Sequence, residues 1–553
     1  MTPSPAEQLR IRWLGRLAYT EAWDLQRAIW EGRVDGRSQD DYLLLLEHPH
    51  TYTVGRNGDG SNLRADTATL ARLNAELHAV DRGGDITYHG PGQLVGYPIM
   101  AVPRLAGGFD AVGHVRRIEE MLIGALRALG IEAWAETGYT GVWTAHGKVA
   151  AIGVRASRGV SMHGFALNVD PDLGYFEHIV PCGIADRPVT SIRQILGEAV
   201  GLEEVVDRLL AHVPAAFGHR TVEAQLGAFV RGSARRLYDV DRMVAEGVFA
   251  PRHSDEAPIT IRGVLPGEPP RPDWMRVTAD FNTDGYRDVR KLMRGLELHT
   301  VCEEAGCPNI YECWEQGTAT IMLLGDTCTR ACAFCDVATG KPGEVDQNEP
   351  MRAADAIAQM GLRHAVLTSV NRDDLPDGGA GVFAATIREI RDRLPTCDIE
   401  VLIPDFKGSR EALECVMMEK PHVLNHNTET VLRLQRDVRT AASYGRSLAL
   451  LARAKWLNPA GTVKSGLIVG MGETESEVLG TLADLRAVGV DIVTIGQYLR
   501  PTPRHRPIDR YVNPVEFERY RREGERLGLP HVEAGPLVRS SYHARDSLAA
   551  AAT

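Results

Sequence analysis

The sequence lacks the features that place a protein in a membrane or on a nucleic acid. No run approaches the roughly 18 apolar residues of a membrane-spanning helix, and the N-terminal MTPSPAEQLRIRWLGRL has no apolar stretch of signal-peptide length. The formal net charge of -11 argues against general nucleic-acid binding, because that binding needs clustered Lys and Arg. We therefore expect a cytoplasmic protein that acts on neither a membrane nor a nucleic acid.

Cysteine is also scarce, and its distribution argues against a disulfide framework. The chain has only nine cysteines in 553 residues, an odd number, and six of them lie between residues 302 and 335. Cysteines so close together, in a chain this long, favour thiolate chemistry in a reducing compartment over disulfide bonds.

The length of the chain exceeds that of one ordinary domain core. Residues 251 to 273, PRHSDEAPITIRGVLPGEPPRPD, contain six prolines and show no apolar period, which is typical of a linker or a domain boundary. We therefore predict a first domain over residues 1–230, a linker over 231–272 and a second domain over 273–553.

The first domain mixes the signals of strands and helices. Residues 42 to 48 (YLLLLEH) and 148 to 155 (KVAAIGVR) are expected to be strands. Between them, a buried helical stripe is predicted by residues at helical spacing, namely Ile118, Met121, Leu122, Ala125, Leu126 and Leu129. Helices and strands without strict alternation indicate an α+β domain.

The second domain has a regular alternation of apolar runs and helical segments. Six runs are expected to be strands, at residues 320–326, 364–370, 399–405, 422–427, 465–471 and 491–498. A helical segment at 475–488 has Val478, Leu479, Leu482 and Leu485 in phase. Six βα units predict a parallel sheet curled into an open or partial barrel, whose active site lies at the carboxyl ends of the strands.

The six clustered cysteines form two groups of three, spaced C-x4-C-x5-C and C-x3-C-x2-C. Three thiolates can hold three irons of a [4Fe-4S] cube and leave the fourth iron open to a substrate or cofactor. A few close cysteines more often bind zinc, but zinc sites usually pair one C-x2-C with another pair, and no nearby fourth ligand is evident in this sequence.

The motif CTRACAFC resembles the signature of radical S-adenosylmethionine (SAM) enzymes, and the preceding LHTVCEEAGCPNIYECW resembles lipoyl synthase in particular. The resemblance runs from about residue 270 to 545. It includes TSVNRDDLPDGGA, LNHNTETV, TIGQYLRPT and GPLVRSSYHA.

This resemblance implies two [4Fe-4S] clusters with different tasks. Cys328, Cys332 and Cys335 would hold the cluster whose open iron binds S-adenosylmethionine. Cleavage of that cofactor then yields a radical that removes hydrogen from C6 and C8 of a protein-bound octanoyl chain. Cys302, Cys307 and Cys313 would hold an auxiliary cluster that donates sulfur, with Ser541 of the R-S-S-Y motif as its fourth ligand.

In the first domain, four segments resemble octanoyltransferases of the lipoate-protein ligase B family: DRGGDITYHGPGQLVGYP, TGVWTAHGKVAAIGVR, MHGFALNV and VPCGIADRPVTSI. The resemblance covers about residues 10 to 220. It implies an acyl-thioester nucleophile at Cys182, which Lys148 activates. Substrate-binding residues would be Arg82, Gly83, Gly84, Asp85, Ile86, Thr87, Tyr88, His89, Ala151, Ile152, Gly153, Gly164, Phe165 and Ala166.

The residue types suit such chemistry, because a lysine beside a thiol can accept its proton or stabilise the thiolate. Thioester exchange followed by amide formation needs no ATP. An ATP-dependent lipoate or biotin ligase of the same fold is the alternative, and it needs no cysteine at position 182.

Together the resemblances imply two domains. The first is an N-terminal α+β domain of the lipoate/biotin protein ligase-like fold, and the second is a C-terminal α/β partial (β/α)6 TIM-type barrel of radical SAM enzymes. We expect a bifunctional enzyme of lipoyl cofactor assembly. Its implied partners are acyl carrier protein as octanoyl donor, a reducing electron donor, lipoyl domains of 2-oxoacid dehydrogenases and glycine cleavage H protein. For the second domain, alternatives are another radical SAM sulfur-inserting enzyme or a non-catalytic iron-sulfur electron carrier.

Overall fold

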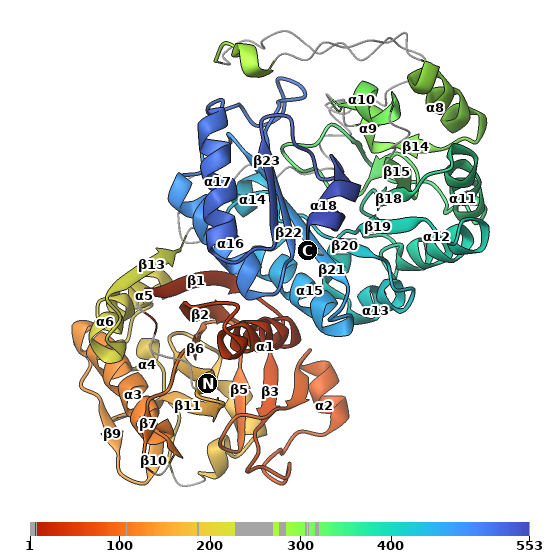
Figure 1. Ribbon diagram of the computed structural model, residues 1–553. Coiled ribbons are helices and arrows are strands. Elements are labelled where there is room, and N and C mark those ends of the chain that lie inside the picture. Colours follow the sequence, from red (N-terminus) through yellow and green to blue (C-terminus); the bar gives the residue numbers. More distant parts are fainter. Residues whose placement is uncertain are drawn as a thin grey trace. The chain divides into compact units, whose positions relative to one another are not determined.

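The computed structural model divides the chain into two compact units, Met1–Phe229 and Val230–Thr553 (Figure 1). The structure describes residues 6, 8–106, 108–184, 187–226, 269–275, 284–304, 307, 309–315 and 320–551. Residues 231–268 of the predicted linker lie outside these ranges. Because the two units are separate bodies, each is described by itself.

The N-terminal unit is built on a mixed sheet of eight strands. Its spatial order is β13 (Thr221–Gln225), β1 (Gln8–Arg16), β2 (Asp41–Glu47), β6 (Gln93–Ile99), β12 (Val160–Asn168), β11 (Gly147–Ser157), β10 (Tyr139–Thr144) and β9 (Trp134–Glu136). The first three strands run parallel to one another, and the others pair antiparallel. The predicted strands at 42–48 and 148–155 are confirmed as β2 and β11.

The predicted helical stripe is part of the hydrophobic core of the N-terminal unit. Helix α3 (Ala111–Ala128) packs against β9, β10 and β11. Five of the six predicted positions are buried in the core, and Leu129, just past the helix end, packs against it. The stripe is therefore confirmed. Helix α1 (Tyr19–Asp35) packs on β12 and β6, and it ends at Gly36 in the left-handed conformation that glycine adopts easily.

A small second sheet flanks the N-terminal unit, in the order β4 (Glu76–Ala79), β3 (Thr51–Val54) and β5 (Ile86–His89). The remaining elements are short. They are α2 (Thr67–Arg72), β7 (Arg104–Leu105), β8 (Gly108–Phe109), the 3-10 turns η1 (Leu173–His178) and η2 (Pro181–Gly183), α4 (Ile192–Leu196), α5 (Leu202–Leu210) and α6 (Val213–Phe217). Helices and strands in this order make an α+β domain, as predicted.

The C-terminal unit is built on a second sheet of eight strands that follow one another in chain order. They are β14 (His299–Thr300), β15 (Thr320–Leu323), β18 (His364–Ser369), β19 (Asp398–Leu402), β20 (Val423–Asn425), β21 (Thr462–Val469), β22 (Ile492–Gln497) and β23 (His531–Gly535). All six predicted strands are confirmed. Only β14 pairs antiparallel, so the sheet is parallel from β15 to β23.

Helices alternate with these strands and lie around the outside of the sheet (Figure 1). They are α11 (Glu349–Met360), α12 (Ala380–Arg393), α13 (Arg410–Met418), α15 (Tyr444–Leu457), α16 (Glu475–Ala487) and α17 (Pro514–Arg526). Helix α16 confirms the predicted helical segment at 475–488, and Thr474 with Glu477 closes its first turn as a capping box. This alternation is the predicted partial (β/α) barrel.

Shorter elements connect the barrel or precede it. They are η4 (Asp273–Met275), α8 (Asp284–Gly295), α9 (Val301–Glu304), α10 (Ile310–Glu315), β16 (Thr327–Cys328), β17 (Ala338–Thr339), η5 (Phe406–Gly408), η6 (Leu432–Leu434), α14 (Gln435–Val438) and α18 (Ala544–Ala551).

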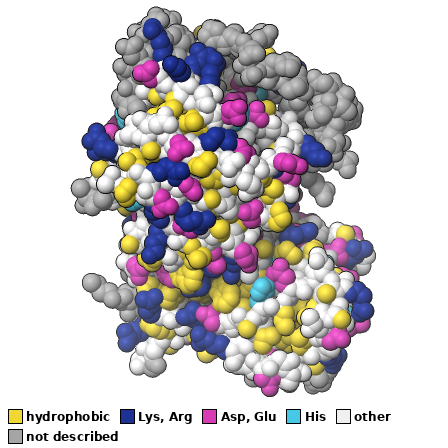
Figure 2. Space-filling model, turned by 90° about the vertical axis from the view of Figure 1, so that its right-hand side faces the viewer, with side chains coloured by type: hydrophobic (Ala, Val, Ile, Leu, Met, Phe, Trp, Pro, Cys, Tyr) yellow, Lys and Arg dark blue, Asp and Glu magenta, His cyan; other side chains and the backbone are white. Residues whose placement is uncertain are grey.

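One face of the described surface mixes charges of both signs. On the face drawn in Figure 2, Lys and Arg side chains lie among Asp and Glu side chains on both units. Within the described residues, no helix is both long and apolar enough to span a membrane.

Candidate active sites

In the N-terminal unit, Cys182 lies at the centre of the 3-10 turn η2 and has a strained backbone. Its φ of 56° falls in the left-handed region, which is costly for a residue with a side chain. The turn is held by hydrogen bonds from Gly183 N to Val180 O and from Ile184 N to Pro181 O. Such strain is often found where a reactive side chain must be presented in a fixed direction.

Lys148 on strand β11 points toward this cysteine. Its Nζ lies 3.6 Å from Cys182 Sγ, within the range of a hydrogen bond to sulfur. The lysine side chain is almost entirely buried, and the ammonium lies 5.4 Å from the centre of the Trp143 ring. The structure thus brings the two predicted catalytic residues together, although they are 34 positions apart in the sequence.

A glycine makes room for the lysine. A Cβ at Gly141 on the neighbouring strand β10 would lie 2.6 Å from Lys148 Cε and 2.5 Å from Ala150 O. Gly141 also has a φ of 126°, which only glycine adopts freely. Any side chain at Gly141 would therefore displace Lys148 from Cys182.

A cavity of about 40 Å³ lies beside Cys182. It is lined by most of the residues predicted to bind substrate, namely Arg82, Gly83, Gly84, Thr87, His89, Ala151, Ile152, Gly153, Gly164, Phe165 and Ala166. Its walls approach closely because they are glycine backbone: a Cβ at Gly153 would lie 2.8 Å from Gly83 O. Asp85, Ile86 and Tyr88 do not line this cavity.

The last three residues have other contacts. Ile86 and Tyr88 alternate with Thr87 and His89 on strand β5, so their side chains enter a separate hydrophobic cluster on the other face. Asp85 accepts hydrogen bonds from Asn62 Nδ2 and from Ile86 N. The predicted binding segment 82–89 therefore divides into residues that face the cavity and residues that support it.

Hydrogen bonds between buried polar groups hold Arg82 and His89 in place on the wall of the cavity. Arg82 donates hydrogen bonds to Thr53 O at 2.6 Å and to Thr53 Oγ1 at 2.8 Å. Burial lowers the pKa of His89 well below its usual value, so its ring is neutral at physiological pH. His89 Nδ1 lies 3.0 Å from Gln93 Oε1, which fixes the direction of the ring.

Three lining residues were not predicted: Tyr19, Tyr97 and His163. Tyr97 OH lies 2.7 Å from His48 Nε2, and His48 Nδ1 lies 2.8 Å from Leu17 O. Because a carbonyl only accepts, His48 carries its proton on Nδ1, and its Nε2 accepts a hydrogen bond from Tyr97 OH. Tyr97 and His163 lie inside quoted motifs, whereas no sequence signal marks Tyr19.

The C-terminal unit has a cavity of about 360 Å³ at the carboxyl ends of its parallel strands. Both cysteine groups reach it, and it is lined by Cys302, Cys307, Cys328, Cys332, Cys335 and Ser541. Cys313 is the one predicted ligand that does not line it. Residues more than 200 positions apart in the sequence thus meet around one space.

The first cysteine group is connected to the R-S-S-Y segment. Cys302 is in α9, Cys313 is in α10, and Cys307 lies between these two helices. Asn309 lies between Cys307 and Cys313. Its Nδ2 donates a 2.7 Å hydrogen bond to Leu537 O, two residues before Arg539. Thr320 Oγ1 donates a 2.9 Å hydrogen bond to Ser541 Oγ. These contacts bring Ser541 toward Cys302 and Cys307.

Burial raises the pKa of several thiols around the cavity: Cys302 to about 12 and Cys332 to about 11. Such thiols stay protonated at neutral pH unless a cation compensates the thiolate charge. Iron in a cluster supplies such compensation and displaces the proton. The set of soft sulfur donors around the space therefore fits the iron-sulfur clusters predicted from the sequence.

In the described part of the chain, no three His, Cys, Asp or Glu side chains converge on a single metal ion. A [4Fe-4S] cluster does not require its ligands to converge on one ion, because each of its thiolates binds a different iron.

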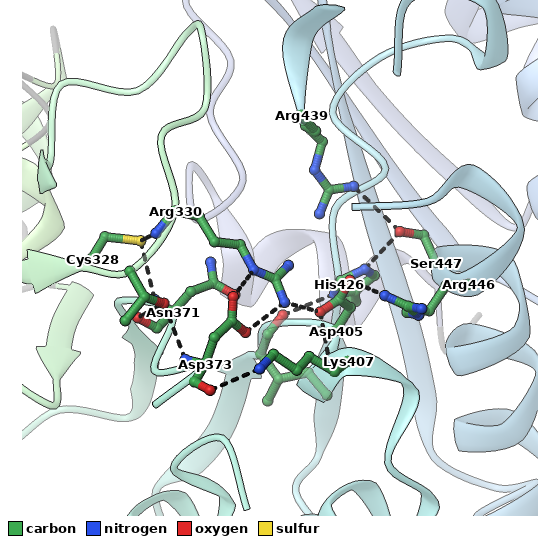
Figure 3. A network of polar contacts seen from close by, with 12 residues as sticks. Cys328, Arg330, Asn371, Asp373, Asp405, Lys407, His426, Arg439, Arg446 and Ser447 are labelled. Carbon is green, nitrogen blue, oxygen red and sulfur yellow. Dashed lines mark hydrogen bonds and ion pairs between the residues drawn. The ribbon is translucent and has the colours of Figure 1, made fainter. Parts of the chain in front are cut away.

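Behind the second cysteine group, Arg330 forms a buried ionic network (Figure 3). Its guanidinium donates to both oxygens of Asp373, at 2.7 and 2.8 Å, and to Asp405 Oδ1 at 2.7 Å. Burial opposes ionisation of Asp405, but Arg330 lowers the pKa of that carboxyl to about 2. The network ties the cysteine loop to the ends of the next two strands.

Two backbone donors, one from the cysteine loop and one from the segment that follows strand β18, meet at one sulfur. Arg330 N and Asn371 N each lie 3.4 Å from Cys328 Sγ (Figure 3). Hydrogen bonds to a ligating sulfur stabilise its thiolate and help to set the reduction potential of a cluster. The two donors suit a sulfur at position 328 that ligates a cluster.

Comparisons with known families divide the chain in the same way as its structure. The lipoyl protein ligase A/B catalytic domain matches residues 18–214, and the radical SAM superfamily matches residues 322–485. Each match lies within one of the two units.

Over 276 residues, half of this chain, the sequence is 59% identical to the lipoyl synthase of Rubrobacter xylanophilus and covers 86% of that protein. It is 55% identical to the lipoyl synthase of Koribacter versatilis over 277 residues, half of this chain and 91% of that protein. A crystal structure of lipoate-protein ligase A bound with ATP is 16% identical, with a TM-score of 0.34, over 39% of this chain and 87% of that one.

Proposed function

The chain belongs to the lipoyl synthase family through its C-terminal half, and from this membership we propose that its two domains act in turn on one acceptor protein. Residues 1–230 transfer octanoyl from acyl carrier protein to a lysine of a lipoyl-dependent domain. Residues 273–553 then insert two sulfur atoms, at C6 and C8 of the bound chain, and residues 231–272 link the two domains.

One observation carries the first step: Lys148 Nζ lies 3.6 Å from Cys182 Sγ, beside a cavity walled by glycine backbone. The thiolate of Cys182 attacks the thioester carbonyl of the octanoyl donor, and the thiol of the carrier leaves. The amine of the acceptor lysine then attacks the octanoyl-Cys182 thioester, and the Cys182 thiolate leaves. Lys148 accepts the proton of the Cys182 thiol before the first attack and returns it to the carrier sulfur as that leaves.

The family match over residues 18–214 includes both ligases and transferases, so it does not choose between them. An ATP-dependent ligase activates its acyl group as an adenylate and needs no thiol beside its lysine. The pairing of Cys182 with Lys148 and the strained turn that presents the thiol both favour the transferase.

Replacement of Lys148 by Met should lower the rate of octanoyl transfer by about 10² to 10⁴-fold, the usual contribution of a general acid or base. Lys148→Arg keeps the positive charge but cannot accept a proton at physiological pH, and it should fail in the same way. Single-turnover acylation of Cys182 measures both rates. Full activity of Lys148→Arg would show that the lysine acts only by its charge.

For the second step, the residues around the larger cavity support two clusters. Cys328, Cys332 and Cys335 would hold one, and Cys302, Cys307, Cys313 and Ser541 the other. When bound, these groups supply an electron for cleavage of S-adenosylmethionine and the sulfur atoms that enter the product. The protein buries the thiols in part, orients Cys328 through two backbone donors and joins the sites of radical formation and sulfur donation in one cavity.

Iron and sulfide analysis tests this assignment. After anaerobic reconstitution we expect about eight irons and eight sulfides per chain, because two cubes hold four of each. Zinc at these cysteines, without sulfide, would contradict the assignment. Cleavage of S-adenosylmethionine by the same sample distinguishes an enzyme from a non-catalytic iron-sulfur electron carrier.

The proposed partners follow from these two reactions. The first needs octanoyl-acyl carrier protein and a lipoyl domain of a 2-oxoacid dehydrogenase or of glycine cleavage H protein. The second needs a reducing electron donor. A tether between the domains raises the effective concentration of the second site around the octanoylated product.

A further inference from the structure

An ion pair lies buried inside the barrel of the C-terminal unit, beneath the larger cavity. Lys464 on β21 and Glu400 on β19 are both 0% exposed, and Lys464 Nζ lies 3.1 Å from Glu400 Oε1. Burial alone would raise the pKa of Glu400. The nearby Lys464, His364 and Asn425 oppose this effect and lower the pKa to about 2. Glu400 is therefore an ionised carboxylate, which can only accept hydrogen bonds.

This charge fixes the orientation of Asn425, on strand β20 between the other two. Asn425 Nδ2 donates to Glu400 Oε1 at 2.9 Å. The reversed amide would place its oxygen against the carboxylate, and that contact is repulsive. In the described part of the chain Asn425 Oδ1 has no hydrogen-bond partner, which is a cost that the contact with Glu400 must offset.

The fixed amide in turn sets the role of Ser540. Asn425 Nδ2 also donates to Ser540 Oγ at 2.8 Å, and Ser540 Oγ donates to Asn427 Oδ1 at 3.1 Å. Asn427 Nδ2 completes the sequence by donating to Glu429 Oε1 at 3.0 Å. The hydroxyl of Ser540 is thus used both as acceptor and as donor, and its direction follows from the buried ion pair.

The adjacent Ser541 is held differently. Its Oγ receives a hydrogen bond from Thr320, and its own proton has no acceptor among the residues that the structure describes. It lines the same cavity as Cys302 and Cys307. Ser540 lines this cavity as well, but its hydroxyl is engaged on both sides, as acceptor from Asn425 and as donor to Asn427, whereas Ser541 is engaged only as acceptor from Thr320.

We infer that Ser540 is a positioning residue, which the Lys464, Glu400 and Asn425 network anchors so that Ser541 is presented to the auxiliary cluster. This inference rests on the proposed function, because it takes Ser541 as a cluster ligand. It explains why the motif needs two serines: one is fixed to the barrel, and the other is left free to bind iron and to release it.

The test uses the full-length chain with Cys328, Cys332 and Cys335 replaced by Ala, so that only the auxiliary cluster forms. Mössbauer spectroscopy on isotope-enriched iron reports a distinct iron site when one ligand is oxygen. Iron loss to a chelator reports how firmly the cluster is held. In this background we compare Ser540→Ala, Ser540→Thr, Asn427→Ala and Ser541→Ala, with Ser409→Ala as matched control. Ser409 Oγ caps helix α13 by accepting a hydrogen bond from Ala412 N, and it donates one to Glu411 Oε2. Ser409→Ala therefore loses one accepted and one donated hydrogen bond, as Ser540→Ala does, but far from the motif in sequence.

We expect Ser541→Ala to abolish the distinct iron site. Ser540→Ala and Asn427→Ala should weaken that site and accelerate iron loss by about tenfold or more, the usual effect of losing a partner of a metal ligand. Ser540→Thr keeps the hydroxyl and should restore the spectrum, and Ser409→Ala should leave it unchanged.

Two results would overturn the inference in different ways. If Ser541→Ala changes the spectrum while Ser540→Ala and Asn427→Ala do not, Ser541 is a ligand but is not positioned by Ser540. If Ser541→Ala leaves the spectrum unchanged, Ser541 is not a ligand, and that part of the proposed function fails as well.

Discussion

Cys182→Ser should abolish octanoyl transfer, with a fall in turnover on the order of 10³-fold or more, because the acyl group loses its nucleophile. A serine hydroxyl beside Lys148 is far less acidic than a thiol, so Lys148 cannot ionise it at neutral pH. The protein should still fold, since Cys182 is only half-buried and the replacement is nearly isosteric.

Intact-mass analysis measures this outcome. After incubation with octanoyl carrier protein and no acceptor, the wild-type chain should gain the mass of one octanoyl group, and Cys182→Ser should gain none. Cys415→Ser is the matched control, because Cys415 is also half-buried and lies in neither cysteine group. Full transferase activity in Cys182→Ser would exclude the covalent mechanism and favour an ATP-dependent ligase.

Loss of one cysteine from each group of the C-terminal unit should separate the two halves of sulfur insertion. Cys332→Ala removes a ligand of the proposed radical-forming cluster, so both cleavage of S-adenosylmethionine and sulfur insertion should disappear. Cys302→Ala affects the proposed sulfur donor, so 5'-deoxyadenosine should still form while no lipoyl product appears. Both cysteines line one cavity, yet only Cys302→Ala should still form 5'-deoxyadenosine.

Liquid chromatography of 5'-deoxyadenosine together with the mass of the acceptor distinguishes the two variants. Each variant should retain about four irons per chain, those of its intact cluster. Lipoyl product from Cys302→Ala at the wild-type rate would show that the first group is not the source of sulfur. Equal loss of 5'-deoxyadenosine in both variants would mean that the clusters do not have separate tasks.

The strands and helices of the barrel were predictable because each signal is local. Six apolar runs of strand length gave six parallel strands, and Val478, Leu482 and Leu485 are completely buried in α16. Strand β23 was not predicted, because His531 and Glu533 interrupt its apolar character.

Strand β1 was missed for an electrostatic reason. Arg10 and Arg12 make the segment look exposed, but both are buried. Arg10 bonds to Asp40 Oδ2 at 2.5 Å and Glu223 Oε2 at 3.0 Å, and Arg12 to Glu223 Oε2 at 2.7 Å. Glu223 lies on β13, more than 200 positions away. Local sequence cannot reveal a charge that is compensated at such a distance.

The candidate sites likewise combine local motifs, which the sequence reveals, with contacts between distant residues, which it does not. The cysteine groups and the Cys182 and Lys148 segments are local motifs, so they could be located in the sequence. The contact between Asn425 and Ser540 joins residues 115 positions apart, and Tyr19 reaches its cavity from a helix without any motif. These contacts depend on the assembled barrel and sheet, and no spacing rule connects their residues.

The mass of a lipoyl-domain acceptor, followed through both reactions of the intact chain, tests the central claim most directly. Incubation with octanoyl-acyl carrier protein, without ATP, should add one octanoyl group to the acceptor lysine. Subsequent addition of a reductant and S-adenosylmethionine should replace two hydrogen atoms of that group by two sulfur atoms. An acceptor that gains its acyl group only when ATP is supplied, or that gains no sulfur after octanoylation, would contradict the account.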